Sequence, residues 1–216
     1  MSLPDLRRDA AIFTRSATAF FRDLEQDNSR EFFTAHRDRY DRAIRIPMEA
    51  LLAHAEDRWG PGRVMRPNRD VRFSADKSPY RLSASLWASS GAAGVYLQLS
   101  PAGLEVGGGL YEPSRDQLAR GRAVIARGGR APDALRSAVD ALTASGFEVA
   151  GPSLSTAPKG YPRDHPAIEL LRLRHYAAVR RLPVSATLAE VDAAWEAVEP
   201  LSAWVDAHVG QAESWP

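Results

Sequence analysis

The spacing of apolar residues changes twice along this chain, and this change limits the possible folds more than any other feature. Up to about residue 59, apolar residues recur at the three- and four-residue intervals of amphipathic helices. Between residues 63 and 111 the period approaches two, and short turns separate the apolar runs, which is typical of antiparallel strands. Helical spacing then returns. The order predicts an α+β fold: a central antiparallel β-sheet meander flanked by N-terminal and C-terminal helices.

Capping and breaking residues indicate where the helices begin and end. Ser29 or Asn28 is expected to cap a helix over about 30–45, and Ser114 a helix over 114–127. A helix is also expected over 166–174 and a strand over 175–182. Pro200 lies inside the apolar stripe of the last helix and predicts a kink or split near Glu199. No internal repeat or linker interrupts the chain, so a single domain over 1–216 is predicted.

Composition excludes several classes of site. The chain has no cysteine, which excludes disulfides, zinc–thiolate sites and cysteine nucleophiles. The formal net charge is +1, which argues against nucleic-acid binding by the chain as a whole and leaves binding by a local basic face as a third, weaker alternative. No apolar run approaches the length of a membrane helix, and the N-terminus has no apolar signal region. We therefore expect a cytoplasmic protein without a cofactor; whether it has a protein partner or forms homo-oligomers stays open.

Lysine and asparagine are rare. Of 28 basic residues only Lys77 and Lys159 are lysine, and Asn28 and Asn68 are the two asparagines. A compositional drift from lysine to arginine explains most of this pattern. Lysine and arginine are not equivalent where a compact ammonium is needed, so both lysines become candidates for a functional role.

The segment from Arg69 to Arg81 is locally basic, with four cations against two carboxylates. One interpretation is an anion site, with Arg69, Arg72 and Lys77 holding a phosphate or carboxylate beside Tyr80. The other is a solvated face on which Asp70 and Asp76 pair locally with the cations. Val71 and Phe73 are expected to share one strand face.

A glycine triplet, Gly107 to Gly109, follows a predicted strand. Glycine lets a ligand approach the backbone closely, and Gly108, Gly109 and the neighbouring Tyr111 are candidate pocket residues. The alternative is a β-bulge or a tight crossing in the sheet. The triplet matches neither a dinucleotide-binding fingerprint nor a P-loop.

The segment from Lys159 to Pro166 joins cations to an expected helix N-terminus. Helix N-termini attract anions through free N–H groups, and Lys159, Arg163 and His165 lie close in sequence. His165 is a candidate general acid or base, because the ordinary pKa of histidine is near neutrality. The alternative is a loop stiffened by prolines, with a capped helix and surface charges.

The remaining candidates are fewer. His36 and His208 lie on apolar helical stripes, and His54 and His175 have no suggestive neighbours in sequence. No spaced ligand set predicts a metal site, and no serine has an identifiable partner base.

Several motifs resemble those of one family. The string RDVRFSADKSPY at 69–80, YLQLSPAGLEVGGGLYEP within 95–113 and APKGYPRDHPAIELL at 157–171 resemble the DUF2461 family, a bacterial and fungal family. The resemblance covers about residues 16–205. It implies the α+β fold of that family and brings no established reaction.

Taken together, the motifs suggest a pocket for a small phosphate- or carboxylate-bearing ligand. Arg72, Lys77 and Lys159 would hold the anion, and Asp70 or His165 would move protons. The alternative is a non-enzymatic interaction module with exposed apolar surface along 32–40 or 191–205. The residues do not decide between an enzyme and a binding protein.

Overall fold

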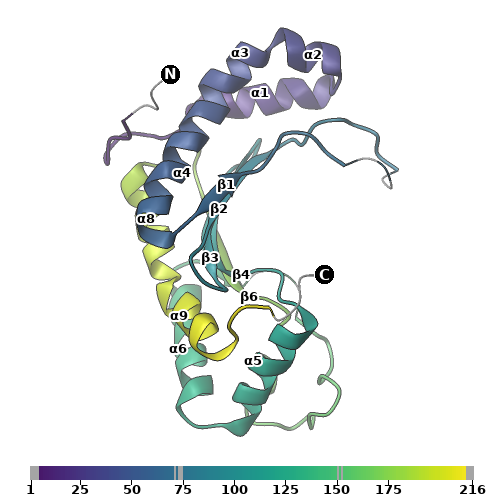
Figure 1. The fold of residues 1–216 in the computed structure, drawn as a ribbon, viewed down its shortest axis with the longest axis vertical. Helices are drawn as coiled ribbons and strands as arrows, with labels where there is room; N and C mark the ends of the chain where they lie inside the picture. Colours follow the sequence, from purple (N-terminus) through teal and green to yellow (C-terminus); the bar gives the residue numbers. More distant parts are fainter. Residues whose placement is uncertain (1–4, 71, 73–74, 150, 152, 213–216) are drawn as a thin grey trace. The chain divides into compact units, whose positions relative to one another are not determined.

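A computed structural model of the protein describes residues 5–70, 72, 75–149, 151 and 153–212. Helices and a six-stranded sheet make up the fold, with the strand order β1-β2-β3-β4-β6-β5 (Figure 1). The sheet is antiparallel, and four of its strands follow one another in chain order. The predicted α+β fold, with N-terminal and C-terminal helices beside an antiparallel meander, is confirmed.

The N-terminal helices are shorter than the sequence suggests. They are α1 (Arg15–Gln26), α2 (Arg30–Ala35), α3 (Arg37–Tyr40), the π-helix η1 (Asp41–Arg45) and α4 (Ile46–Trp59). The single helix expected over 30–45 is interrupted at His36, whose backbone leaves the helical region at φ −109° and ψ 16°. Ser29 is the expected cap, because its side chain accepts a hydrogen bond from Phe32 N.

The strands are β1 (Gly62–Val64), β2 (Ala84–Ala88), β3 (Gly94–Ser100), β4 (Gly103–Leu110), β5 (Glu148–Val149) and β6 (Tyr176–Leu182). In β3 the buried residues alternate with half-buried ones, as one covered face requires. The expected strand positions Val71 and Phe73 lie outside the described residues.

The C-terminal helices are α5 (Arg115–Arg127), α6 (Arg130–Ala144), α7 (Ile168–Leu171), α8 (Leu188–Ala197) and α9 (Glu199–His208). The split predicted from Pro200 is confirmed, because α8 and α9 part at Val198 and the proline lies in the first turn of α9. The helix expected over 166–174 is wrong in length: a single turn over 168–171 forms, since residues 172–175 lead into β6.

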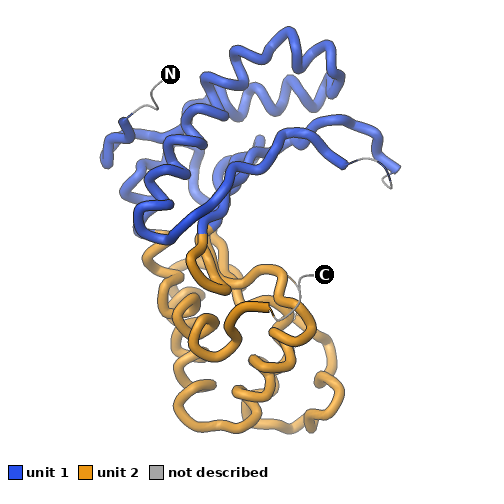
Figure 2. The backbone as a smooth tube through the Cα atoms, viewed as in Figure 1, with its two compact units in different colours: residues 1–88, 96–106, 181–193 blue, residues 89–95, 107–180, 194–216 orange. Residues whose placement is uncertain are grey.

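The chain divides into two compact units (Figure 2). Unit 1 comprises residues 1–88, 96–106 and 181–193, and unit 2 comprises residues 89–95, 107–180 and 194–216. Strands β3, β4 and β6 contribute residues to both. The single domain expected from the sequence stays a prediction.

Unit 1 has an aromatic core. Phe20 is fully buried, and its ring centroid lies 6.0 Å from Phe33 and 5.5 Å from Tyr40. Helix α4 packs against β1 and β2, and its Met48 and Leu51 are fully buried. Burial of these large side chains is the main force that holds the helices on the strands.

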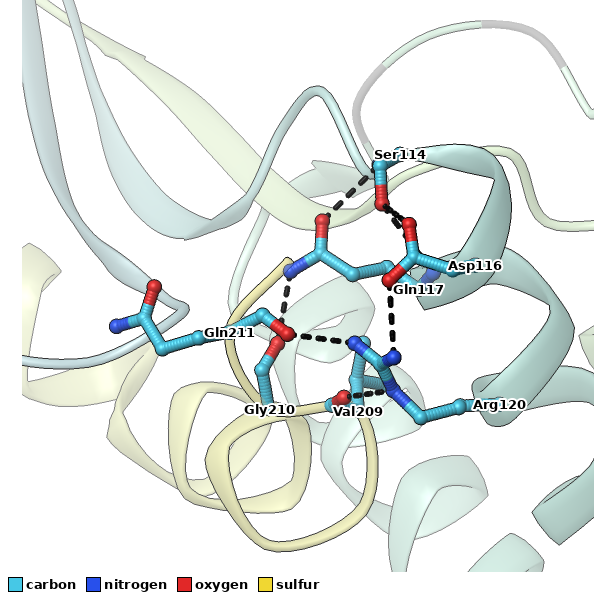
Figure 3. A network of polar contacts seen from close by, with 7 residues as sticks. All are labelled: Ser114, Asp116, Gln117, Arg120, Val209, Gly210 and Gln211. Atoms are coloured by element: carbon cyan, nitrogen blue, oxygen red, sulfur yellow. Dashed lines mark hydrogen bonds and ion pairs between the residues drawn. The ribbon is translucent and has the colours of Figure 1, made fainter. Parts of the chain in front are cut away.

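In unit 2, α5 is bound to the segment that follows α9 (Figure 3). Ser114 and Gln117 form a capping box, which confirms the predicted cap. Arg120 Nε donates to Val209 O over 2.6 Å and its Nη2 to Gln211 O over 2.6 Å. The buried Gln117 donates to Gly210 O over 2.7 Å. The segment after α9 is therefore held by side chains of α5.

Candidate functional site

The described residues of 65–83, which are 65–70, 72 and 75–83 and are here called the arm, continue the β1–β2 hairpin beyond the sheet (Figure 1). Asn68 and Tyr80 form an isolated antiparallel bridge, and Arg69 N donates to Pro79 O over 2.8 Å. Closer to the sheet, Met65 N donates to Ser85 O over 2.8 Å. Between these two pairings, the outgoing side advances by three residues, from 65 to 68, whereas the returning side advances by five, from 80 to 85. The arm is therefore a hairpin with extra residues on its returning side.

Tyr80 holds the arm on the N-terminal helices of unit 1. Its backbone is bound at both polar groups by the side chain of Asn28, and its ring stacks on Phe33 with centroids 4.0 Å apart and an interplanar angle of 11°. Only 9% of Tyr80 is exposed. Tyr80 was predicted as a ligand contact, but its ring lies in the core. From there it positions the cations that precede and follow it in the arm.

The predicted anion-binding residues are engaged in local ion pairs. Arg72 donates to both carboxylate oxygens of Asp70, with Nη2 to Oδ2 at 2.7 Å, and Arg69 Nη1 pairs with Asp76 Oδ2. The hydrogen bond from Arg72 lowers the pKa of Asp70, and that from Arg69 lowers the pKa of Asp76. Both carboxylates are ionised and exposed at neutral pH. Local pairing, one of the two interpretations of this motif, is what the structure shows.

The arm has further cations. Arg66 and Arg81 are exposed, and within the part of the chain that the structure describes neither takes part in an ion pair. Lys77 is exposed as well. Arg63, at the base of the arm in β1, lies over the Trp87 ring at 5.6 Å from its centroid.

Trp87 lies on a sheet face that differs from the core face. It alternates along β2 with the buried Leu86 and Ala88, and 38% of it is exposed. Register pairing places Trp87 directly opposite Arg63. On β3 the half-buried Tyr96 likewise alternates with buried residues, and its hydroxyl donates to Gln98 Oε1 over 3.1 Å. The apolar periodicity predicts strands between residues 63 and 111 but does not show which strand face is exposed, so the exposure of Trp87 was missed from the sequence.

The glycine triplet of β4 lies in unit 2 and packs against backbone. A side chain at Gly107 would overlap the carbonyl oxygen of Ala178, and one at Gly109 that of Tyr176. Gly108 faces the carbonyl of Gly94 in the same way. These contacts match the alternative of a tight crossing in the sheet. Tyr111, which follows, is 55% exposed and lies with its ring centroid 5.1 Å from that of His175.

The loop from Lys159 to His165 is also in unit 2, and Lys159 and Arg163 are exposed there. His165 is half-buried, and its Nδ1 accepts a hydrogen bond from Ala167 N over 3.0 Å. The helix that follows the loop, α7, has four residues, so its dipole is small, and His165 accepts the hydrogen bond of the Ala167 amide just before it. The predicted anion site at this loop stays a prediction.

A buried hydroxyl in unit 2 was not foreseen from the sequence. Tyr176 is 1% exposed, and among the described residues its hydroxyl has no hydrogen-bond partner. The hydroxyl lies against Gly121 of α5, where any side chain would overlap it. Burial raises the pKa of Tyr176 to about 12, an effect that the nearby Arg122 partly opposes.

One histidine has a partner that sequence reasoning missed. His54 Nε2 lies 2.8 Å from Asp192 Oδ1, which joins α4 to α8 within unit 1. The residues are 138 positions apart, so no local pattern reports the pair.

Among the described residues no group of three or more His, Asp or Glu could hold a metal ion. No helix within the described ranges is long and apolar enough to cross a membrane.

A depression of about 430 Å³ lies elsewhere in unit 1. It is bordered by the N-terminal segment and the start of α4, through residues such as Leu6, Ile12 and Ile46. None of the predicted site residues lines it.

These features define a class: a small α+β protein with an antiparallel sheet, a cationic hairpin arm and a glycine-packed central strand. The chain belongs to the DUF2461 family, described as conserved hypothetical proteins, whose model matches residues 16–204. The expected resemblance is thereby confirmed. No curated protein matches the chain.

Proposed function

We propose that this protein binds a phosphate- or carboxylate-bearing ligand through the arm, with Arg69, Arg72 and Lys77 as the anion-binding residues. The observation that carries the proposal is the exposure of Arg72 and Lys77, with the half-buried Arg69, on a hairpin that Asn28 and Phe33 hold at Tyr80. Anchoring at Tyr80 restricts the adjoining backbone and so reduces the entropy that it would otherwise lose on binding a ligand.

The ion pairs of the arm are compatible with ligand exchange. In the Arg72–Asp70 pair the side chains are 77% and 60% exposed, so solvent screens their attraction. A phosphate can replace a carboxylate on the same guanidinium, since both accept paired N–H donors. Asp70 and Asp76 would then serve to orient the arginines before the ligand arrives.

The residues predicted in unit 2 are a separate part of the proposal. Within that unit, Lys159 and Arg163 offer exposed cations, and Gly108, Gly109 and Tyr111 are the other proposed ligand contacts. If a ligand reacts, Asp70 of the arm or His165 of unit 2 is the group proposed to move protons. Substitution of that group, by Asp70→Asn or by His165→Gln, would then abolish turnover while the ligand still binds.

Differential scanning fluorimetry with pyrophosphate, nucleotides and citrate tests the proposal. Ligand binding to the native state raises stability by about 2.7 kcal/mol at a ligand concentration of one hundred times Kd. Arg72→Ala and Lys77→Ala should remove the shift, and Arg136→Ala on α6, which is equally exposed, should retain it. Identical shifts in all variants, or none in the wild type, would exclude the arm as an anion site.

The alternative of an interaction module finds less support. The stripes on which it depends are covered: Phe33 and Tyr40 in one, and Trp195, Leu201 and Val205 in the other, are all buried. Exposed large apolar residues within the described ranges are Trp87 and Tyr111. Neither of these lies on the two stripes named for this alternative.

A further inference from the structure

The charge of this chain is unevenly distributed. Residues 62–81 hold six cationic side chains and two carboxylates, a formal charge of +4, although the whole chain has +1. The rest of the chain is therefore acidic by 3 charges. A net charge near zero argues against nucleic-acid binding when charges are mixed evenly, but a local basic stripe creates its own attractive field.

The cations are spread along β1 and the arm. Arg63 lies in β1, and Arg66 and Arg69 follow it on the outgoing side of the arm at intervals of three residues. At about 3.3 Å per residue in an extended strand, Arg63 and Arg69 are up to about 20 Å apart along the backbone. A single phosphate group contacts one or two of these cations at a time. A nucleic-acid strand, with one phosphate per nucleotide, can contact them in succession.

An exposed aromatic ring adjoins this series of charges. Trp87 is opposite Arg63 in the β1–β2 register, and the guanidinium lies 5.6 Å from the ring centroid. Trp87 is 38% exposed, an unusual state for a tryptophan on a strand whose neighbours Leu86 and Ala88 are fully buried. Aromatic rings beside cations are the recurring elements of surfaces that bind single-stranded nucleic acid, because every base can stack on them.

We infer that unit 1 binds single-stranded nucleic acid, with the phosphates along Arg63, Arg66, Arg69 and Arg81 and a base stacked on Trp87. The inference rests on the proposed anion binding by the arm and names the ligand class. A duplex fits less well, because its bases are stacked inside the helix and cannot reach Trp87. An acidic peptide could meet the cations but has no base for the indole ring.

The test is fluorescence anisotropy with a labelled oligothymidylate of about 20 nucleotides and the full chain. Affinity should fall with salt, with a log–log slope of about −3 for four phosphate contacts. Arg66→Glu with Arg81→Glu should weaken binding at least tenfold and make the slope shallower by about 1.4. Arg136→Glu with Arg174→Glu, an equal charge change on exposed residues of unit 2, should change neither slope nor affinity by more than about twofold.

Trp87→Leu separates stacking from charge. It should weaken binding about five- to a hundredfold and leave the salt slope unchanged. Trp87→Tyr should restore most of the affinity, which guards against a folding defect, and a thermal melt of each variant checks the fold directly.

The outcomes distinguish the two proposals. If inorganic polyphosphate competes as well as the oligonucleotide and Trp87→Leu has no effect, the nucleic-acid inference is overturned and anion binding by the arm stands. If a duplex binds as tightly as the single strand, the inference also fails. If neither polyanion binds and no small anion shifts the melting temperature, both proposals fall.

Discussion

Asn28 binds both backbone polar groups of Tyr80, 52 positions away in the chain. Its Nδ2 donates to Tyr80 O over 3.0 Å, and its Oδ1 accepts from Tyr80 N over 3.1 Å. A carboxamide offers a donor and an acceptor side by side, which matches the two groups of one residue in an extended strand. This contact, together with the stacking of Phe33, fixes the arm on unit 1.

Replacing Asn28 by alanine should destabilise the protein by about 1–3 kcal/mol, because both Tyr80 groups are partly buried and would lose their partners. Urea unfolding followed by circular dichroism measures the change. Asn68→Ala is the matched control: this second asparagine is exposed, and its substitution should cost less than about 0.5 kcal/mol. Equal effects of the two substitutions would contradict a specific role for Asn28.

Gly109→Ala should be strongly destabilising, by about 3 kcal/mol or more, because two costs add. The residue has φ +108°, and a Cβ there would overlap the Tyr176 carbonyl. Gly146→Ala is the control with a positive φ of +79° and open space around it. It should cost about 1 kcal/mol. Thermal melts of both variants decide whether close packing, beyond backbone conformation, requires glycine in β4.

Stability should fall above pH 10 because of two buried tyrosines. Burial raises the pKa of Tyr40 and that of Tyr176 from 10 to about 12, so the folded state holds these protons more tightly than the unfolded state does. The stabilisation is constant below pH 10 and is lost as the pH rises towards 12, by about 1.4 kcal/mol per pH unit and group. Urea unfolding at pH 9, 10 and 11 should show this slope halved in Tyr176→Phe and also in Tyr40→Phe.

In the same series, Tyr176→Phe should be at least as stable as the wild type at pH 7. Its hydroxyl is buried without a partner among the described residues, so removing it deletes an uncompensated polar group. A loss above about 1 kcal/mol would reveal a bound partner for the hydroxyl, such as a water molecule.

Arg120→Lys should destabilise unit 2 by about 1–3 kcal/mol, because a lysine cannot reach Val209 O, Gln211 O and Asp116 at the same time. Arg115→Lys, an exposed neighbour on the same helix, should have little effect. Hydrogen exchange of the amides in 209–212 measures the local consequence: faster exchange is expected for Arg120→Lys alone.

Local signals in the sequence predicted the parts of the fold that depend on near neighbours. Ser29 and Ser114 cap helices and Pro200 splits one, because each effect acts within a single turn. The short α7 was not predictable, since its end is set by the distance to β6 and not by a breaking residue.

The candidate site was predictable to a lesser extent. The Asp70–Arg72 pair spans two positions, and local pairing was one of the two interpretations. The contacts of Asn28 with Tyr80 and of His54 with Asp192 join segments far apart in the chain, where no periodicity reports proximity. Nor could residue type alone show that Trp87 is exposed and Tyr80 buried.

The contact between Gly121 and Tyr176 has a consequence for how this family can evolve. The hydroxyl fills the space that a side chain on α5 would take, so the two positions share one volume. A relative with alanine or serine at the position of Gly121 should therefore have a smaller residue, or one without a hydroxyl, at the position of Tyr176. Substitutions at these two positions should be inherited together, and a lineage that changes one first would pass through a destabilised intermediate.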